Sequence, residues 1–192
     1  MSCDITSGRI EQCKDSVSVL KAIYFANFDD LDSDDVTYNA TDTDVIDSWQ
    51  PAAAITLYKY ELKSTANSFT TAINSSRDNG TTFFEQTLVA NLKRQDFATH
   101  KNVKLLAYGR PRIIVRTMTD QFFLMGLDQG ADVSAGEIST GAALGDFNGY
   151  SLTFTAQEEL PANFINVATE AALATAFADG AGTDAVINDG TA

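Results

Sequence analysis

The segment RDNGTTFFEQTLVANLK, residues 77–93, decides the fold class of this 192-residue chain. Its Asn79-Gly80 pair is the strongest short-range signal for a tight β-hairpin turn. Beyond the turn, alternate positions carry the apolar residues Phe84, Leu88, Ala90 and Leu92. The positions between them carry Glu85, Thr87 and Asn91. A period of two predicts a β-strand with one apolar and one polar face.

A second alternating segment, AITLYKYELK at residues 54–63, precedes the turn. One parity carries Tyr58, Tyr60 and Leu62. The other parity carries Lys59, Glu61 and Lys63. We therefore expect a single long hairpin across residues 54–93. Its polar face is predicted to carry Glu61, Lys63, Glu85, Thr87 and Asn91.

Further strands and a helix are predicted elsewhere in the chain. Aromatic and β-branched residues predict strands in segments 20–28, 45–49 and 150–159, and a second hairpin over 112–127. Residues 94–111 predict a helix that Asp96 caps and Gly109 ends, and a shorter helix is expected over residues 169–178. The chain is therefore predicted to be mainly β, as a β-sandwich or barrel with one flanking α-helix.

The length fits one domain with appendages. We expect an N-terminal arm at residues 1–17, a β-sandwich domain at 18–165 and an Ala-rich C-terminal extension at 166–192. Cys3 and Cys13 both lie in the arm, either as reduced thiols or as a small disulfide loop. The sequence has no run of ~18 apolar residues and no Sec-type signal peptide, so it predicts no membrane span and synthesis in a cytoplasm.

The formal net charge of −13 is unevenly distributed along the chain. Residues 1–50 carry 11 acidic and 3 basic side chains, residues 51–120 carry 5 and 10, and residues 121–192 carry 10 and none. Acidic ends around a basic middle argue against a nucleic-acid clamp, whose contact surface would be positive. The asymmetry favours head-to-tail stacking of copies, or it serves solubility alone.

The sequence carries no enzyme signature. The single histidine, His100, lies in the predicted helix, and no Gly-x-Ser-x-Gly nucleophile elbow is present. The glycines of GAALGDFNG, residues 141–149, are followed by a strand rather than by the helix and lysine of a phosphate loop. Asp146 and Asn148 are therefore interpreted as turn formers, and we expect no catalytic residue, metal or cofactor.

An aspartate-rich segment, DDLDSDD at residues 29–35, offers a possible calcium loop. Asp30, Asp32 and Asp34 have the spacing of the first ligands of such a loop. Asp35 stands where the loop needs glycine, and Thr41 stands where it needs a bidentate glutamate. A solvated acidic loop is therefore the favoured interpretation.

The order of these elements resembles that of the tail tube (major tail) proteins of tailed bacteriophages. The resemblance rests on the YELK strand, on the segment FFEQTLVANLKRQDFATHKNVKLLAYGRPRIIVRTMTDQFFLMGLDQGADV and on TGAALGDFNGYSLTFTAQEELPA. The opening CDITSGRIEQCKDSVSVLKAIYFANF is similar to that of virion proteins of this kind. The resemblance covers residues 1–165 and leaves out the C-terminal extension.

The resemblance implies a virion protein that self-assembles in the host cytoplasm into hexameric rings, which stack into a tube. One long hairpin per copy would contribute to an inner β-barrel, the channel for genome ejection. The implied partners are other copies, a tape-measure protein, tail terminator and baseplate proteins and, if the tail contracts, a sheath protein. DNA would pass without specific binding, and no membrane is involved.

Site residues follow from this resemblance. The residues expected to face the lumen are Glu61, Lys63, Glu85, Thr87 and Asn91. A neutral or acidic polar lumen would let DNA slide, whereas a basic one would bind its phosphates. Ring-to-ring contacts are expected from the arm 1–17 and the loop 29–49, with stacking candidates Asp29, Asp30, Asp32, Asp34 and Asp35.

Two alternatives remain open at this point. A tail terminator or neck ring protein of similar fold would form one closed ring that does not polymerise. An unrelated β-sandwich binding module could depend on calcium through the aspartate-rich segment.

Overall fold

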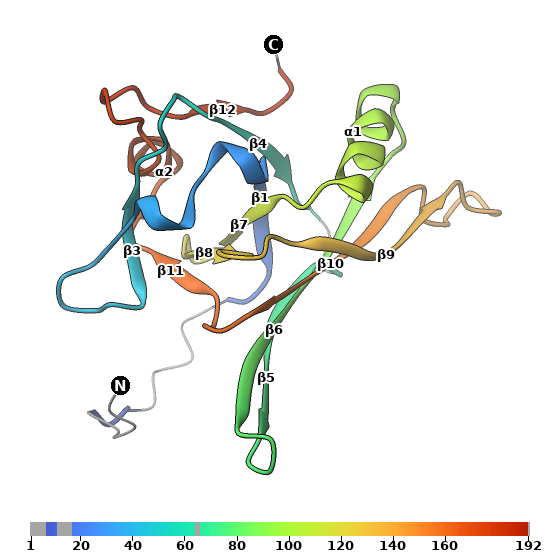
Figure 1. The fold of residues 1–192 in the computed structure, drawn as a ribbon. Helices are drawn as coiled ribbons and strands as arrows, with labels where there is room; N and C mark the ends of the chain where they lie inside the picture. The colour runs from blue at the N-terminus through green and yellow to red at the C-terminus, as the bar shows by residue number, and fades with distance from the viewer. Residues whose placement is uncertain (1–6, 11–16, 64–65, 192) are drawn as a thin grey trace.

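The computed structural model describes residues 7–10, 17–63 and 66–191. Cys3, Cys13 and most of the predicted N-terminal arm lie outside the described residues. Within the described ranges the chain is mainly β, with twelve strands in two sheets and two α-helices (Figure 1). The predicted fold class is therefore confirmed.

The larger sheet has eight strands in the order β12-β4-β1-β7-β8-β11-β3-β2. Their bounds in that order are Val186–Asn188, Thr56–Glu61, Leu20–Ala26, Arg112–Thr117, Phe122–Met125, Asn163–Ile165, Val45–Trp49 and Val36–Tyr38. The smaller sheet has four antiparallel strands in the order β5-β6-β10-β9. Their bounds are Ser68–Ser76, Thr81–Lys93, Gly149–Glu158 and Asp132–Ser139.

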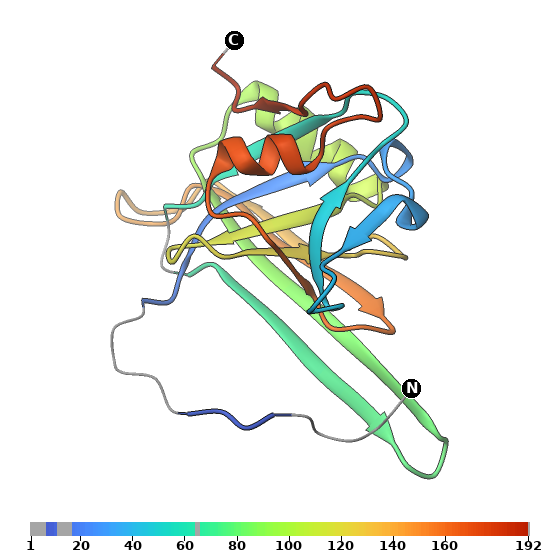
Figure 2. The same ribbon diagram turned by 90° about the vertical axis from the view of Figure 1, so that its left-hand side faces the viewer.

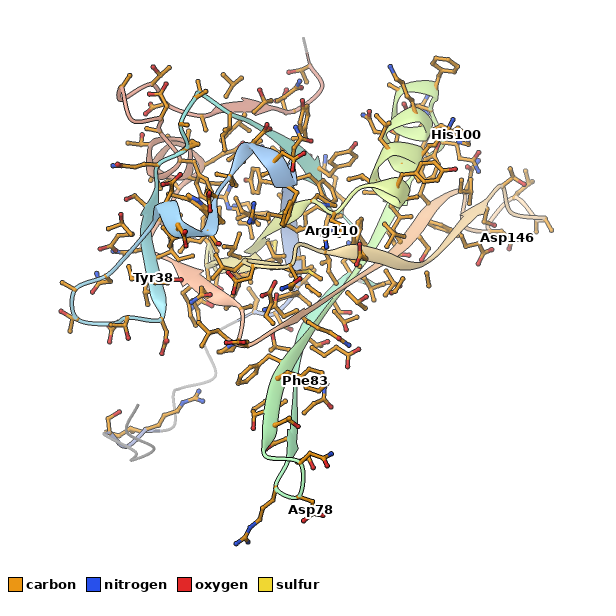
Figure 3. The ribbon with its side chains drawn as sticks, viewed as in Figure 1. Tyr38, Asp78, Phe83, His100, Arg110 and Asp146 are labelled. Atoms are coloured by element: carbon orange, nitrogen blue, oxygen red, sulfur yellow. The ribbon has the colours of Figure 1, made fainter. Side chains whose placement is uncertain are left out.

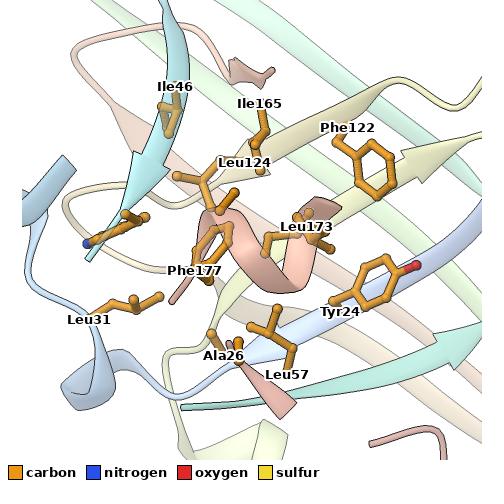
Figure 4. Close-up of a cluster of buried hydrophobic side chains, with 14 of the residues drawn as sticks. Tyr24, Ala26, Leu31, Ile46, Leu57, Phe122, Leu124, Ile165, Leu173 and Phe177 are labelled. Atoms are coloured by element: carbon orange, nitrogen blue, oxygen red, sulfur yellow. The ribbon is translucent and has the colours of Figure 1, made fainter. Parts of the chain in front are cut away.

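The larger sheet curves around the helix α2 (Glu170–Ala176) and encloses a first hydrophobic core (Figures 1 and 4). Leu173 and Phe177 are fully buried in it, and the Phe177 ring lies 5.9 Å from the Trp49 ring. Thr169 begins the helix by accepting a hydrogen bond from the Ala172 N–H. The residues expected as a C-terminal extension thus contribute a core helix and, in β12, a strand that pairs with β4.

A second core lies between the two sheets. The larger sheet contributes Phe25, Ile113 and Val115, and the smaller one contributes Leu88 and Phe154, all nearly or fully buried. β1 and β7 bury both of their faces, which explains their nearly continuous apolar runs LKAIYFA and RIIVRT.

The helix α1 (Phe97–Tyr108) lies beside the second core, at one side of the smaller sheet (Figure 1). Asp96 accepts a hydrogen bond from the Thr99 N–H at its start, and the Gly109 N–H donates to the Leu105 carbonyl at its end. Val103 is the one buried residue of this helix. Its predicted position and both predicted end signals are confirmed.

One hairpin prediction is wrong. Residues 68–93 do form the long hairpin β5–β6, but β4 belongs to the other sheet, where Tyr60 lies opposite Ile23 of β1. The alternation of residues 54–63 correctly identifies a strand, but β4 lies between β12 and β1, with Leu57 in the first core and Tyr60 packed against the second. A period of two identifies a strand, but it does not identify the strand's partner. The second hairpin, β7–β8, is as predicted.

Candidate functional surface

One face of the smaller sheet is polar and turned away from the second core. We call it the polar face. It carries Ser68, Thr70, Ala72 and Asn74 of β5, Phe83, Glu85, Thr87, Val89, Asn91 and Lys93 of β6, Ser151, Thr153, Thr155 and Gln157 of β10, and Asp132, Ala135, Glu137 and Ser139 of β9. The alternate residues of β6 and β10, such as Leu88 and Phe154, pack into the core beneath it.

Hydroxyl and amide side chains dominate the polar face. Thr70, Thr87 and Thr155 lie directly opposite one another across β5, β6 and β10. Such cross-strand threonine pairs stabilise a sheet without adding charge. The charged residues on this face are Glu85, Asp132, Glu137 and Lys93, so its balance is mildly acidic.

The structure brings three of the five predicted lumen residues together on the polar face. Glu85 and Thr87 are half-buried, and the Asn91 N–H donates to the Asn67 side-chain oxygen at 2.7 Å. Glu61 and Lys63 lie elsewhere, in an exposed ion pair of 2.9 Å at the end of β4. Because β4 belongs to the larger sheet, Glu61 and Lys63 do not lie on the polar face.

The contribution of β10 to the polar face was not predicted from the sequence. The alternation of Ser151, Thr153 and Thr155 with Leu152 and Phe154 was visible in the sequence. It could not place β10 beside β6, because strand pairing depends on the whole fold. β9 gives a weaker signal, since a bulge at Ser134 interrupts its alternation.

The hairpin β5–β6 projects from the body of the molecule (Figures 1 and 2). β10 accompanies β6 only as far as the pair Glu158 and Phe84, so residues 74–83 extend beyond the rest of the sheet. Asp78 marks the tip of this hairpin (Figure 3). Asp146 marks the separate loop between β9 and β10, where it accepts hydrogen bonds from the Ala142 and Ala143 N–H groups, as a turn former does.

The smaller sheet is open at both edges. β5 and β9 are its outer strands, and neither pairs with another strand of the described residues on its free side. Each edge also exposes an apolar residue on the face opposite the polar one: Ile73 of β5 is 69% exposed and Ile138 of β9 is 48% exposed. Open strand edges with apolar flanks are sites where another chain can pair.

The aspartate loop, residues 29–35, lies just beyond the end of β1. Its five aspartates, Asp29, Asp30, Asp32, Asp34 and Asp35, are all exposed. Asp30 accepts a hydrogen bond from the Asn27 side chain, and Asp32 caps the Asp34 N–H. Across the described ranges, no three His, Cys, Asp or Glu side chains come together as possible metal ligands.

A buried guanidinium anchors this loop from below. Arg112 is 2% exposed and donates to the carbonyls of Leu127, Phe28 and Leu31 at 2.9, 2.6 and 2.6 Å. Its guanidinium also stacks 4.3 Å from the centre of the Phe28 ring. Burial lowers the pKa of Arg112 from its ordinary value. The loop backbone is therefore held in place while its carboxylates face solvent.

A second buried charge lies at the root of the projecting hairpin. Glu158 is 5% exposed and accepts hydrogen bonds from the Asp128 and Gln129 N–H groups at 3.2 and 2.9 Å. Burial raises its pKa above the ordinary value of 4.5, although these two N–H groups act in the opposite direction. Glu158 borders a cavity of about 250 Å³ together with Phe83 and Glu159.

Opposite ends of the larger sheet differ in charge. The aspartate loop follows the end of β1, whereas Lys21 lies at its start and Arg116 at the end of the antiparallel β7. There Asp120 binds Lys21 at 3.0 Å and Arg116 at 2.7 Å, and Glu170 binds Lys59 at 2.8 Å. One end is thus strongly acidic and the other is a network of ion pairs.

Comparisons with known proteins give no match: no family model, no curated protein and no solved structure is similar to this chain. No helix formed by the described residues has both the length and the apolar character needed to cross a membrane.

Proposed function

We propose that this chain is the structural subunit of a phage tail tube, and not an enzyme. Six copies form a ring, and stacked rings form the channel through which the genome leaves the virion. The observation that carries the proposal is a four-stranded sheet with one polar face, one core-packed face and two open edges. Such a sheet is stable within a subunit, and its open edges can pair with strands of neighbouring copies.

The arrangement of the two open edges supports a closed barrel. β5 pairs with the part of β6 nearer the hairpin turn, residues 81–89, whereas β9 is level with residues 87–93. The two edges are therefore displaced along the strand direction. Closing sheets into a barrel requires such a displacement, because barrel strands tilt against the barrel axis.

The chemistry of the polar face supports a lumen. Duplex DNA carries one negative charge per ~1.7 Å of its axis, and basic side chains along a channel would bind it. The polar face offers hydroxyl and amide groups with three acids and a single lysine, Lys93 at one end. A surface of this kind repels DNA phosphates or does not bind them, so the genome slides through without being held.

Stacking of rings is supported by the charge difference between the two ends of the larger sheet. Head-to-tail contact is heterologous, so it joins two different surfaces and can repeat along an axis without closing. The aspartate loop is one such surface, and its anchored backbone suits a repeated contact. In a virion the tube would also meet a tape-measure protein, terminator and baseplate proteins and, in a contractile tail, a sheath.

Negative-stain electron microscopy of the purified protein, together with its mass from light scattering, tests the proposal. The expected result is rings of six and tubes whose length grows with concentration. A monomer at every concentration would overturn it. Single rings that never stack would indicate a terminator or neck ring instead. A rise in melting temperature with millimolar calcium would favour the calcium-dependent binding module.

A further inference from the structure

The strands at the two open edges of the smaller sheet, β5 and β9, run in opposite directions. β5 runs antiparallel to β6 and β9 runs antiparallel to β10, so β9 and a neighbour's β5 can meet as an antiparallel pair. The polar face carries even-numbered residues on β5 and, beyond the bulge, odd-numbered residues on β9. A one-residue slip would move every side chain to the wrong face, so only every second register is compatible with the sheet.

We propose that β9 of one copy pairs with β5 of the next copy in the register that sets Ala135 opposite Ala72. This inference rests on the tail tube proposal and names the contact that joins the copies within a ring. On the core side, the register sets Ile138 opposite Phe69 and, past the bulge, Val133 opposite Ile73. Both exposed isoleucines are then covered by an apolar side chain of the neighbouring copy.

The two nearest registers lose these contacts. A slip of two residues in one direction sets Ile138 opposite Thr71 and leaves Ile73 opposite Gly136. The slip in the other direction sets Ile138 opposite Asn67 and Phe69 opposite Gly136. Only the proposed register pairs apolar residues with apolar residues at both positions. It also matches every residue of β9 except the bulged Ser134 with a residue of β5.

The proposed register has a geometric consequence. Ser139 of β9 is level with Lys93 of β6, whereas Ser68 of β5 is level with Val89. Pairing Ser139 with the neighbour's Ser68 therefore displaces each copy by four residues, about 13 Å, over four strands that together span about 19 Å. The strands then tilt by about 35° from the barrel axis, at the lower end of the range found in closed barrels.

Six copies with this tilt enclose a wide channel. Four strands from each copy, spaced by about 4.8 Å, close into a barrel about 45 Å across between opposite backbones. The hydroxyl and amide side chains of the polar face line its inside. The proposed register is therefore compatible with the passage of duplex DNA.

Cysteine cross-linking tests the register. Ala135→Cys is combined in turn with Thr70→Cys, Ala72→Cys or Asn74→Cys, in a background where Cys3 and Cys13 are replaced by serine. Directly opposite residues on antiparallel strands have Cα atoms about 4.5–5.5 Å apart, within disulfide range, whereas diagonal neighbours lie about 7–8 Å apart. After mild oxidation of assembled protein, the A72C pair should give a ladder up to six copies on a non-reducing gel.

The three matched pairs make every result informative. Cross-linking through T70C or N74C in place of A72C would overturn the register, and so would assembled tubes in which no pair cross-links. Both of these results leave the tail tube proposal standing, because assembly is scored separately by electron microscopy. If the cysteine-free background itself never assembles while remaining folded by circular dichroism, the tail tube proposal fails together with the register.

Discussion

Replacement of Arg112 by methionine should destabilise the folded subunit by about 3–5 kcal/mol. The change keeps an unbranched side chain but removes the donors to the carbonyls of Phe28, Leu31 and Leu127. Each buried acceptor left without a partner costs about 1–3 kcal/mol, and part of that cost is relieved by local rearrangement. For a chain of this length the loss corresponds to a fall in melting temperature of roughly 10 °C.

Urea unfolding followed by circular dichroism, at protein concentrations below assembly, measures this loss. Arg110→Met is the matched control, because Arg110 also stacks on Phe28, at 4.9 Å, but is exposed. The control should lose about 1 kcal/mol or less, the size of an exposed cation–π contact. Equal losses in the two variants, or a loss below about 1 kcal/mol in R112M, would refute the anchoring role of Arg112.

Four other outcomes are expected. Thr87→Lys places a cation at the centre of the polar face, so tubes of this variant should retain duplex DNA at low salt and release it at high salt. Tubes of the control Ala98→Lys, whose lysine lies on exposed α1, should not retain DNA. Phe177→Ala should cost about 3–5 kcal/mol in urea unfolding, since Phe177 is fully buried. Because burial raises the folded-state pKa of Glu158, the wild-type free energy of unfolding should fall as pH rises from about 4.5 towards that pKa. Glu158→Gln should lack this fall in urea unfolding series between pH 4 and 8. Changing the five aspartates of the aspartate loop to asparagine should leave rings intact but abolish tubes in micrographs; persistent tubes would exclude the loop as the stacking contact.

Local sequence signals predicted the elements well, because each depends on neighbours in the chain. Asp96 and Gly109 bounded α1 correctly, and Asn79-Gly80 identified the hairpin turn. Pairing between distant strands was not predictable in this way. β4 alternates as β6 does, yet it pairs with β12 and β1 in the larger sheet, and this misplaced Glu61 and Lys63.

The polar face was half predicted for the same reason. Glu85, Thr87 and Asn91 were found from the alternation of one strand, whereas the neighbouring row on β10 required knowledge of the pairing of Thr155 with Thr87. The anchoring role of Arg112 left no sequence signal, since nothing local distinguishes this arginine from the exposed Arg110.

The position of α2 and β12 has a consequence for how the subunit is made. Leu173 and Phe177 fill the first core, and β12 pairs with β4, more than a hundred residues earlier in the chain. A chain still on the ribosome cannot complete this core until residues 170–188 have emerged. Chains cut short by interrupted translation would keep Trp49 and Leu57 without their packing partners, so they should be recognised as unfolded and degraded. The order of synthesis would thus act as a quality check on every copy.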